Sequence, residues 1–315
     1  NHSMLLDYDQ MDDLRHQLEV PTEDEWASFA LDSHAGRLCQ ETVSRLYPDT
    51  ISTPKTLVAD ELPIKLSVSR SGHVSTQQTF GRLLMAISRE PKLAERVVTA
   101  SPDVAVSTNL SGWILKMGVY APEKVTNYER RPDSLSDWRQ GPEGQHIELG
   151  ISEMNLFMML GMFGLSTDLI GQQLIPIGTV YDPFVLRGLE SLIYSLYSGA
   201  RFIFAGTPSG ISLSTEGGAH QSTINPSIGI GIPNLRAVEP CFAQEMEWIM
   251  LEALHDCCDQ ENGRTTYLRL STKPIDQTLL EPALKRLGEQ ELRRQVISGG
   301  YRLVDWRDVG PARQD

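Results

Sequence analysis

Four short segments carry side chains whose types and spacing could do chemistry, and the first is a carboxylate ahead of an apolar stretch. Glu153 follows a turn at Gly150 and opens a segment rich in Met, Leu and Phe. An acid there can simply stabilise the start of a helix, by roughly 0.3–1 kcal/mol, with Ser152 as the cap. Because apolar neighbours on most sides predict burial, the carboxylate also needs a polar partner, and a polar heterocycle is one candidate.

The second and third segments place aromatic and imidazole rings in turns. Tyr181 and Phe184 lie three positions apart after an apolar run, and they are either ordinary core residues or a shelf on which a flat ring stacks. His220 comes shortly after Gly217 and Gly218, which let the backbone approach a ligand closely. A histidine in such a loop is either structural or a general acid–base.

Asp103 completes the set, at the end of another apolar run, where it either caps the next helix or lines a pocket.

The elements that must position these residues alternate between short apolar runs and helical patterns, which favours an α/β fold: a doubly wound, mainly parallel sheet with helices on both faces. In such a sheet, ligands bind beyond the carboxyl ends of the strands, where the four segments fall. Strands are expected at 96–100, 145–149, 174–179, 201–205, 235–238 and 266–270, and helices at 110–117, 153–163, 183–197, 243–255 and 282–295.

Three regions along the chain differ in composition and in the structure that their residues predict. Residues 1–70 hold four prolines and many acids, and we expect an irregular connector with short helices near Asp9–Leu18 and Glu23–Leu31, the second capped by Thr22. Residues 71–276 should form the α/β domain. Residues 277–315, which contain one strand-like piece after the last helix, should link to a further domain.

Composition and charge exclude several classes of function. The 315 residues carry a net charge of −13, which gives no electrostatic footprint for nucleic acid. No run approaches the roughly 20 apolar residues that span a bilayer, and no secretory signal is visible. The cysteines lack zinc-ligand spacing and indicate reduced thiols in a cytoplasmic protein; they are Cys39, Cys241, Cys257 and Cys258. The chain opens without Met, so we expect a fragment.

Taken together and in this order, the four segments resemble the pyrimidine-binding domain of transketolase-like thiamine diphosphate enzymes. The resemblance is closest to the decarboxylating component of bacterial homodimeric pyruvate dehydrogenases, and the stretches 14–21, 75–80, 118–122 and 144–145 extend it over nearly the whole chain. It therefore implies thiamine diphosphate as the cofactor and pyruvate, or another small 2-oxo acid, as the substrate.

The resemblance also implies a role for each residue. Glu153 matches the glutamate that activates the cofactor by a hydrogen bond to its pyrimidine ring. Tyr181 and Phe184 match the aromatic residues that flank that ring. His220 matches a histidine that faces the reacting end of the cofactor, and Asp103 matches an acid of the pocket.

Two departures from the family pattern bear on the function. Gln221 follows His220, as in transketolases, where the pyruvate dehydrogenases have an acidic, His-rich stretch. No Gly-Asp-Gly with a downstream Asn occurs, so the ligands of Mg²⁺ and of the diphosphate are expected in a domain absent from this chain, which alone should be inactive.

The resemblance implies a homodimer and a lipoyl-bearing dihydrolipoyl acyltransferase as partners. The Met-rich helix 153–163 is the expected dimer contact, because its apolar residues occupy more faces than one sheet can cover. One alternative is a transketolase, which moves two-carbon ketol units between sugar phosphates. It is disfavoured because Arg187 is the nearest basic residue in loops poor in Lys and Arg. The other alternative is a non-catalytic dimerisation domain, against which the retained Glu153 and His220 argue.

Overall fold

The computed structural model describes residues 5–23, 26–47, 56–125, 138–212 and 217–305. The chain forms two compact units, residues 1–53 and 54–315. In the first unit, helix α1 (Tyr8–Gln17) begins with a capping box, in which the side chains of Asp7 and Gln10 each accept a hydrogen bond from the other residue's backbone N–H. This helix confirms the one expected near Asp9–Leu18.

The second helix of the first unit lies later than predicted. Of the expected range, residues 24 and 25 lie outside the described residues, and 26–30 form no helix. Helix α2 (His34–Leu46) begins instead where the Ser33 side chain accepts a hydrogen bond from the Gly36 N–H. A serine that directly precedes the helix therefore provides the cap, and not Thr22.

An eight-stranded sheet organises the second unit, and every strand pair in it is parallel. Its order is β4-β3-β5-β2-β6-β7-β9-β8. From the central strand β2 the chain builds first toward β4 and then, from β6 onward, toward β8, so the winding reverses between β2 and β6. The strands are β2 (Val97–Ser101), β3 (Val119–Tyr120), β4 (Gln140–Gly141), β5 (His146–Glu148), β6 (Ile175–Val180), β7 (Ile203–Gly206), β8 (Leu235–Val238) and β9 (Thr265–Arg269).

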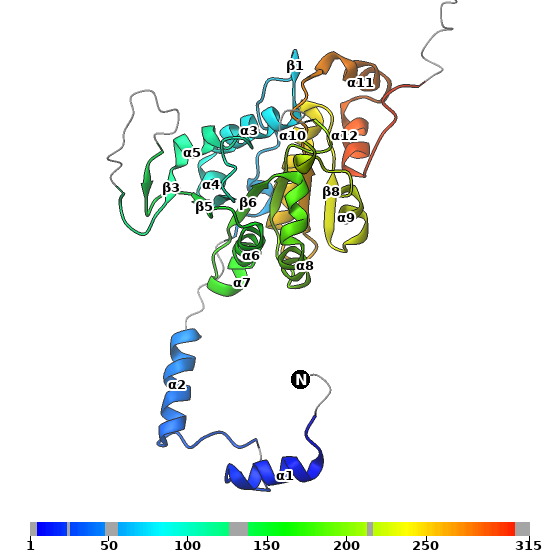
Figure 1. Cartoon of the computed structure of the whole chain (residues 1–315). Coiled ribbons are helices and arrows are strands. Elements are labelled where there is room, and N and C mark those ends of the chain that lie inside the picture. Colours follow the sequence, from blue (N-terminus) through cyan, green and yellow to red (C-terminus); the bar gives the residue numbers. More distant parts are fainter. Residues whose placement is uncertain (1–4, 24–25, 48–55, 126–137, 213–216, 306–315) are drawn as a thin grey trace, which may run out of the picture. The chain divides into compact units, whose positions relative to one another are not determined.

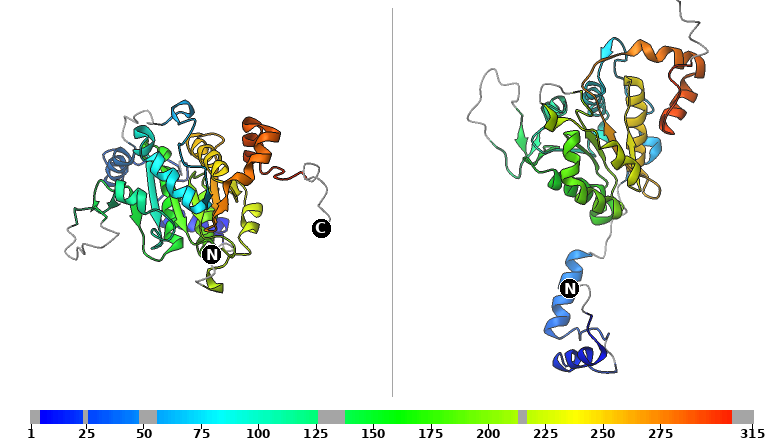
Figure 2. Two further views of the ribbon diagram at one scale, coloured as in Figure 1. Left: turned by 90° about the horizontal axis from the view of Figure 1, so that it is seen from above. Right: turned by 45° about the vertical axis from the view of Figure 1, so that its right-hand side comes forward.

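Helices cover both faces of this sheet, which confirms the predicted fold class (Figure 1, and from above in Figure 2). On one face, α3 (Thr76–Ile87), α5 (Ser111–Met117) and α10 (Ala243–Cys258) build a core around Phe80, Trp113 and Met246. On the other, α6 (Glu153–Gly164) and α8 (Leu189–Tyr197) pack through Phe157 and Leu192. The short α4 (Pro91–Ala94), α7 (Ser166–Ile170) and α9 (Pro226–Gly231) complete the domain.

Two helices expected to be continuous are divided at glycines. The range 183–197 splits into the 3₁₀ helix η2 (Asp182–Gly188) and α8, because η2 packs so closely on α6 that a Cβ on Gly188 would lie 2.7 Å from the Glu153 carbonyl oxygen. The range 282–295 splits into α11 (Glu281–Leu287) and α12 (Glu289–Ile297), because Gly288 has a φ of +77°.

The remaining elements are short. Strands β1 (His73–Val74) and β10 (Ile275–Asp276) form a separate antiparallel pair, and η1 (Ala59–Glu61), η3 (Gly218–His220) and η4 (Gln277–Leu280) are 3₁₀ turns. After α12, the described residues up to 305 contain no strand, so the strand-like piece expected there is absent from that part; residues 306–315 lie outside it. No helix in the described ranges is long and apolar enough to cross a membrane.

Candidate functional site

The predicted site residues gather at one edge of the sheet, where neighbouring parallel strands end. Glu153 follows β5, Tyr181 follows β6, and His220 lies in the loop after β7. These strands flank the place where the winding of the sheet reverses, which is where open α/β sheets bind their ligands.

Glu153 is a buried carboxylate at the start of α6, with 4% of its surface exposed. Ser152 makes no capping hydrogen bond, so the serine cap considered from the sequence is not formed. The partner of Glu153 is Arg187 at the end of η2, with Nε 3.3 Å from Oε2 and Nη1 3.4 Å from Oε1. This ion pair supplies the polar partner that the buried Glu153 carboxylate requires.

Three rings lie against one another beside this ion pair. The Tyr181 and Phe184 rings are 6.1 Å apart between centroids and tilted by 37°. The His220 ring meets both nearly edge-on, at 5.5 Å from Tyr181 and 5.4 Å from Phe184. All three side chains are half-buried, so the cluster retains an accessible surface. We call these residues the ring cluster.

Arg187 joins the ring cluster to the buried carboxylate. Its guanidinium carbon lies 5.4 Å from the centroid of the Phe184 ring, while its nitrogens contact Glu153. The structure thus brings Glu153, Tyr181, Phe184 and His220 into one connected group of side chains. A flat ring with polar edges can use both surfaces of such a group, stacking on the aromatics and bonding to the carboxylate.

Asp103 occupies a different position from the other four. It lies just beyond β2 with a φ of +64°, and its side chain is exposed. Its backbone N–H donates to Glu148 Oε1 over 2.7 Å, and Glu148 Oε2 lies 3.3 Å from Nε2 of the buried His146. Asp103 is therefore fixed through its backbone to the end of β5, while the ring cluster reaches the β2–α5 loop through the Tyr181–Ser107 hydrogen bond of 2.9 Å.

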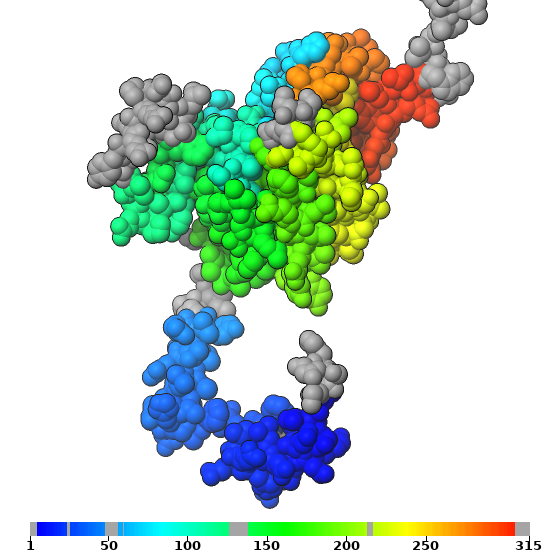
Figure 3. All heavy atoms as spheres, viewed as in Figure 1, coloured from blue at the N-terminus to red at the C-terminus, as the bar shows by residue number. Residues whose placement is uncertain are grey.

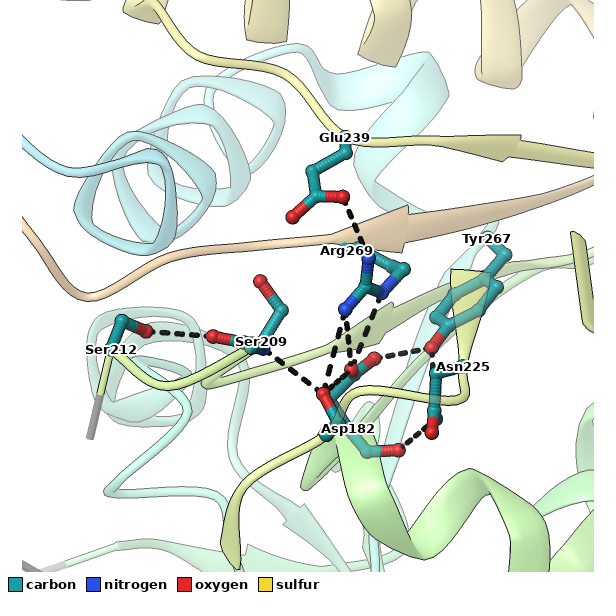
Figure 4. A network of polar contacts seen from close by, with 9 residues as sticks. Asp182, Ser209, Ser212, Asn225, Glu239, Tyr267 and Arg269 are labelled. Carbon is teal, nitrogen blue, oxygen red and sulfur yellow. Dashed lines mark hydrogen bonds and ion pairs between the residues drawn. The ribbon is translucent and has the colours of Figure 1, made fainter. Parts of the chain in front are cut away.

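A second set of buried polar residues, absent from the sequence-based prediction, surrounds Asp182, which directly follows Tyr181 (Figure 4). Asp182 is fully buried and accepts hydrogen bonds from Tyr267, Ser222 and Arg269. Burial, and then the Asp182 charge, raises the pKa of the Tyr267 hydroxyl far above its ordinary value, which keeps it a donor. In the sequence, Arg269 could have indicated this buried set, because a cation inside an apolar strand needs a buried anion as its partner.

The described residues fit one half of thiamine diphosphate. Glu153 offers a carboxylate to a ring nitrogen, and Tyr181 and Phe184 offer half-buried aromatic faces to a flat ring. For the diphosphate and its metal, the described part of the chain contains no cluster of three or more His, Cys, Asp or Glu side chains that could hold an ion. The arrangement therefore suits recognition of an aromatic heterocycle.

The sequence of the chain is similar to those of known proteins. Residues 59–273 match the family model of the pyruvate dehydrogenase E1 component middle domain. The chain is 22% identical over 248 residues to the "Pyruvate dehydrogenase E1 component" of Pseudomonas aeruginosa, covering 78% of this chain and 27% of that protein. With the protein of the same description from Corynebacterium glutamicum it shares 26% over 211 residues, which is 65% of this chain and 22% of the relative. The chain thus spans about a quarter of the length of these relatives.

Solved transketolases share the fold. The transketolase of Pichia stipitis in complex with sedoheptulose 7-phosphate superimposes with a TM-score of 0.61 at 16% identity, over 95% of this chain and 42% of that one. The transketolase of Leishmania mexicana gives a TM-score of 0.53 at 18% identity, over 86% and 35%. At these identities the likeness concerns the arrangement of the sheet and helices alone.

Proposed function

The chain belongs to the family of pyruvate dehydrogenase E1 component middle domains, and from this premise we propose that it supplies the pyrimidine-binding half of a thiamine diphosphate-dependent 2-oxo acid dehydrogenase. The proposed substrate is pyruvate, and the proposed acceptor of the acyl group is the lipoyl group of a dihydrolipoyl acyltransferase. The observation that supports this most directly is the buried Glu153 carboxylate beside the ring cluster.

Each residue of the site has a physical task in this proposal. Glu153 would share a proton with a nitrogen of the pyrimidine ring in a setting shielded from water, which strengthens the hydrogen bond. Tyr181 and Phe184 stack on the ring and fix its plane. His220 holds or moves a proton at its imidazole, or stabilises negative charge on the substrate oxygen. When bound, thiamine diphosphate supplies the electron sink for decarboxylation.

Arg187 sets a condition on this binding. It contacts the same carboxylate oxygens that the pyrimidine would use. Because its side chain is 54% exposed, it can turn toward water at modest cost, so a ligand can take its place on Glu153. Asp103 is proposed to line the outer part of the pocket, as an exposed acid beyond β2.

Transketolase activity is the second candidate, and one residue favours it: Gln221 after His220. A ketol transfer between sugar phosphates needs cations aimed at the substrate phosphates. Arg187 is the single Lys or Arg in the segments 102–110, 181–188 and 207–225, and so small a number of cations is an argument for the smaller, unphosphorylated substrate.

We propose that the chain acts as a homodimer, and that the diphosphate and Mg²⁺ are held by residues outside this chain. Met158, Met162 and Tyr194 are 56%, 57% and 67% exposed on adjoining turns of α6 and α8. They border a mostly apolar groove of about 400 Å³. Figure 3 shows the green surface of these two helices on one face of the domain. Because α6 begins at Glu153, a copy seated on this face would also cover the site.

Carbon dioxide release tests the function. The assembled enzyme that contains this chain, supplied with thiamine diphosphate, Mg²⁺, pyruvate and an artificial electron acceptor, should release CO₂, and Glu153→Gln should lower kcat by about two to four orders of magnitude. Asp168→Asn is the control, since this exposed acid lies in the first turn of α7, which follows the other end of α6. Ketol transfer from a sugar phosphate without CO₂ release from pyruvate would overturn the proposal in favour of a transketolase.

Sedimentation tests the dimer. Met158→Glu should place a charge in the apolar groove and shift the protein to monomers, whereas Ile230→Glu, at an apolar position of α9 that is 89% exposed, should not. A monomeric wild type would refute the role of this face.

A further inference from the structure

The buried cluster around Asp182 links three separate segments of the chain. Asp182 begins η2, Tyr267 and Arg269 lie on β9, and Ser222 and Asn225 belong to the loop that carries His220. The Asp182 carboxylate accepts hydrogen bonds from Ser222, Tyr267 and Arg269, and the Asn225 side-chain amide donates to its backbone carbonyl. Figure 4 shows Arg269 between Asp182 and Glu239.

Ser222 adds no charge to this cluster, in which Arg269 pairs with both Asp182 and Glu239. Arg269 Nε and Nη2 lie 3.3 and 3.2 Å from Asp182 Oδ2, and Nη1 lies 2.6 Å from Glu239 Oε2. Although burial works against its charge, Asp182 and then Glu239 raise the pKa of Arg269, so it remains a cation. Because the Ser222 hydroxyl is uncharged, its contribution is a hydrogen bond that ties the loop to the buried cluster.

Ser222 is held from several directions. Besides donating to Asp182, its Oγ accepts from the Gly210 N–H over 3.0 Å, and its own N–H donates to the Gly210 carbonyl over 3.0 Å. Its side chain is 4% exposed, whereas residues 217–219 just before it are exposed. His220 stands two positions ahead of this anchored residue.

We infer that Asp182, acting through Ser222, is the positioning residue that holds His220 against the rings of Tyr181 and Phe184. Asp182 lies next to Tyr181 in sequence and two residues before Phe184, so one carboxylate fixes the two aromatic rings and the loop of the histidine relative to each other. The geometry leaves no spare room: a Cβ on Gly206 would lie 2.2 Å from Asp182 Oδ1 and 2.8 Å from the Tyr267 ring. The inference rests on the proposed function only for its effect on catalysis.

Ser222→Ala is the sharpest test, because it removes the hydroxyl and leaves every charge in place. Ser166→Ala is its matched control: Ser166 is likewise 4% exposed, and its Oγ accepts from the Leu174 N–H over 2.9 Å, at the start of α7. In the full chain, hydrogen exchange of backbone amides over residues 217–225 should quicken about tenfold in Ser222→Ala and stay unchanged in Ser166→Ala.

The imidazole of His220 gives a second readout that a merely structural role would not move. Its NMR signal, identified by its loss in His220→Gln, should shift toward that of a solvated histidine in Ser222→Ala and in Asp182→Asn. Unchanged exchange over 217–225 together with an unmoved His220 signal would overturn the inference, and so would equal effects of the control.

The assembled enzyme adds the catalytic arm. Ser222→Ala should lower kcat for pyruvate about tenfold with little change in KM, since binding of the substrate is left intact. A loosened loop with unaltered kcat would refute the positioning role. If the loop readouts respond as expected but the wild type does not release CO₂ from pyruvate, the proposed function fails while the anchoring of His220 stands.

Discussion

Replacing Arg187 by alanine should destabilise this chain more than replacing Glu153 by glutamine, although the two side chains form one ion pair. The asymmetry comes from their exposure: the Glu153 side chain is 5% exposed and that of Arg187 is 54% exposed. Removing the arginine leaves a buried carboxylate without its counter-ion. Removing the carboxylate charge leaves an arginine that can turn into water.

The magnitude lies between two limits. Breaking a fully buried ion pair from one side costs about 3–5 kcal/mol, and a surface pair is worth about 0–1 kcal/mol. Because one partner here is half in water, we expect about 1–2 kcal/mol for Arg187→Ala, including its cation–π contact with Phe184 at 5.4 Å. For Glu153→Gln, an amide of nearly the same shape, we expect about 0–1 kcal/mol.

Urea unfolding followed by circular dichroism measures both values, together with the double variant. If the cost of Arg187→Ala is the stranded carboxylate, the double variant should be more stable than Arg187→Ala alone, with a coupling of about 1 kcal/mol. Equal costs for the two single variants, or strict additivity, would refute the reasoning. A nearly neutral Glu153→Gln would also mean that its loss of activity reports chemistry and not unfolding.

Three further outcomes follow from other contacts. Gly188→Ala should cost about 1–3 kcal/mol in urea unfolding, because its Cβ would lie 2.4 Å from an aromatic carbon of α6; an unchanged midpoint would contradict the close packing of η2 on α6. At pH 8, iodoacetamide should alkylate the exposed Cys39 well before Cys258, whose pKa burial raises to about 11, and mass spectrometry of partly labelled protein would show the reverse order if this is wrong. The pKa of Glu291 is lowered to about 2 by its hydrogen bonds from Arg294 and a neighbouring glutamine. The stability that the pair contributes is therefore present above about pH 4.5 and is lost as the pH falls toward 2. The difference in urea midpoint between wild type and Arg294→Gln should shrink from pH 6 to pH 3, and a constant difference would exclude this linkage.

Much of the fold could be predicted because the signals are local. The strand β8 was expected at 235–238 and is found there, and the helix expected at 153–163 is α6. Helix breaks were harder, since a glycine within a helical pattern is often tolerated. Gly188 ends η2, where the segment packs against α6. Gly288 ends α11, where the backbone takes a positive φ. Neither reason is visible in the periodicity of apolar residues.

The candidate site, like the fold, could be predicted only in part from the sequence. The order of Glu153, Tyr181, Phe184 and His220 after successive strands was visible in the sequence, and parallel strand ends meet at one edge. The buried cluster was not, since Asp182 meets Tyr267 and Arg269 across 85 and 87 positions. A pattern identifies which residues need a partner, as Arg269 did, but the choice of partner depends on the packed structure.

The short helix η2 explains how one segment can serve every part of the site. Asp182 reaches the loop of His220, Phe184 enters the ring cluster, and Arg187 contacts Glu153. A 3₁₀ helix rises about 2.0 Å per residue, so Asp182 and Arg187 are separated by about 10 Å along its axis, against about 7.5 Å in an α-helix. The extended rise lets seven residues span from the cluster on β9 to the start of α6. The continuous α-helix expected from the sequence would shorten that span by about 2.5 Å, so the 3₁₀ geometry of η2 sets how far apart Asp182 and Arg187 stand along the segment.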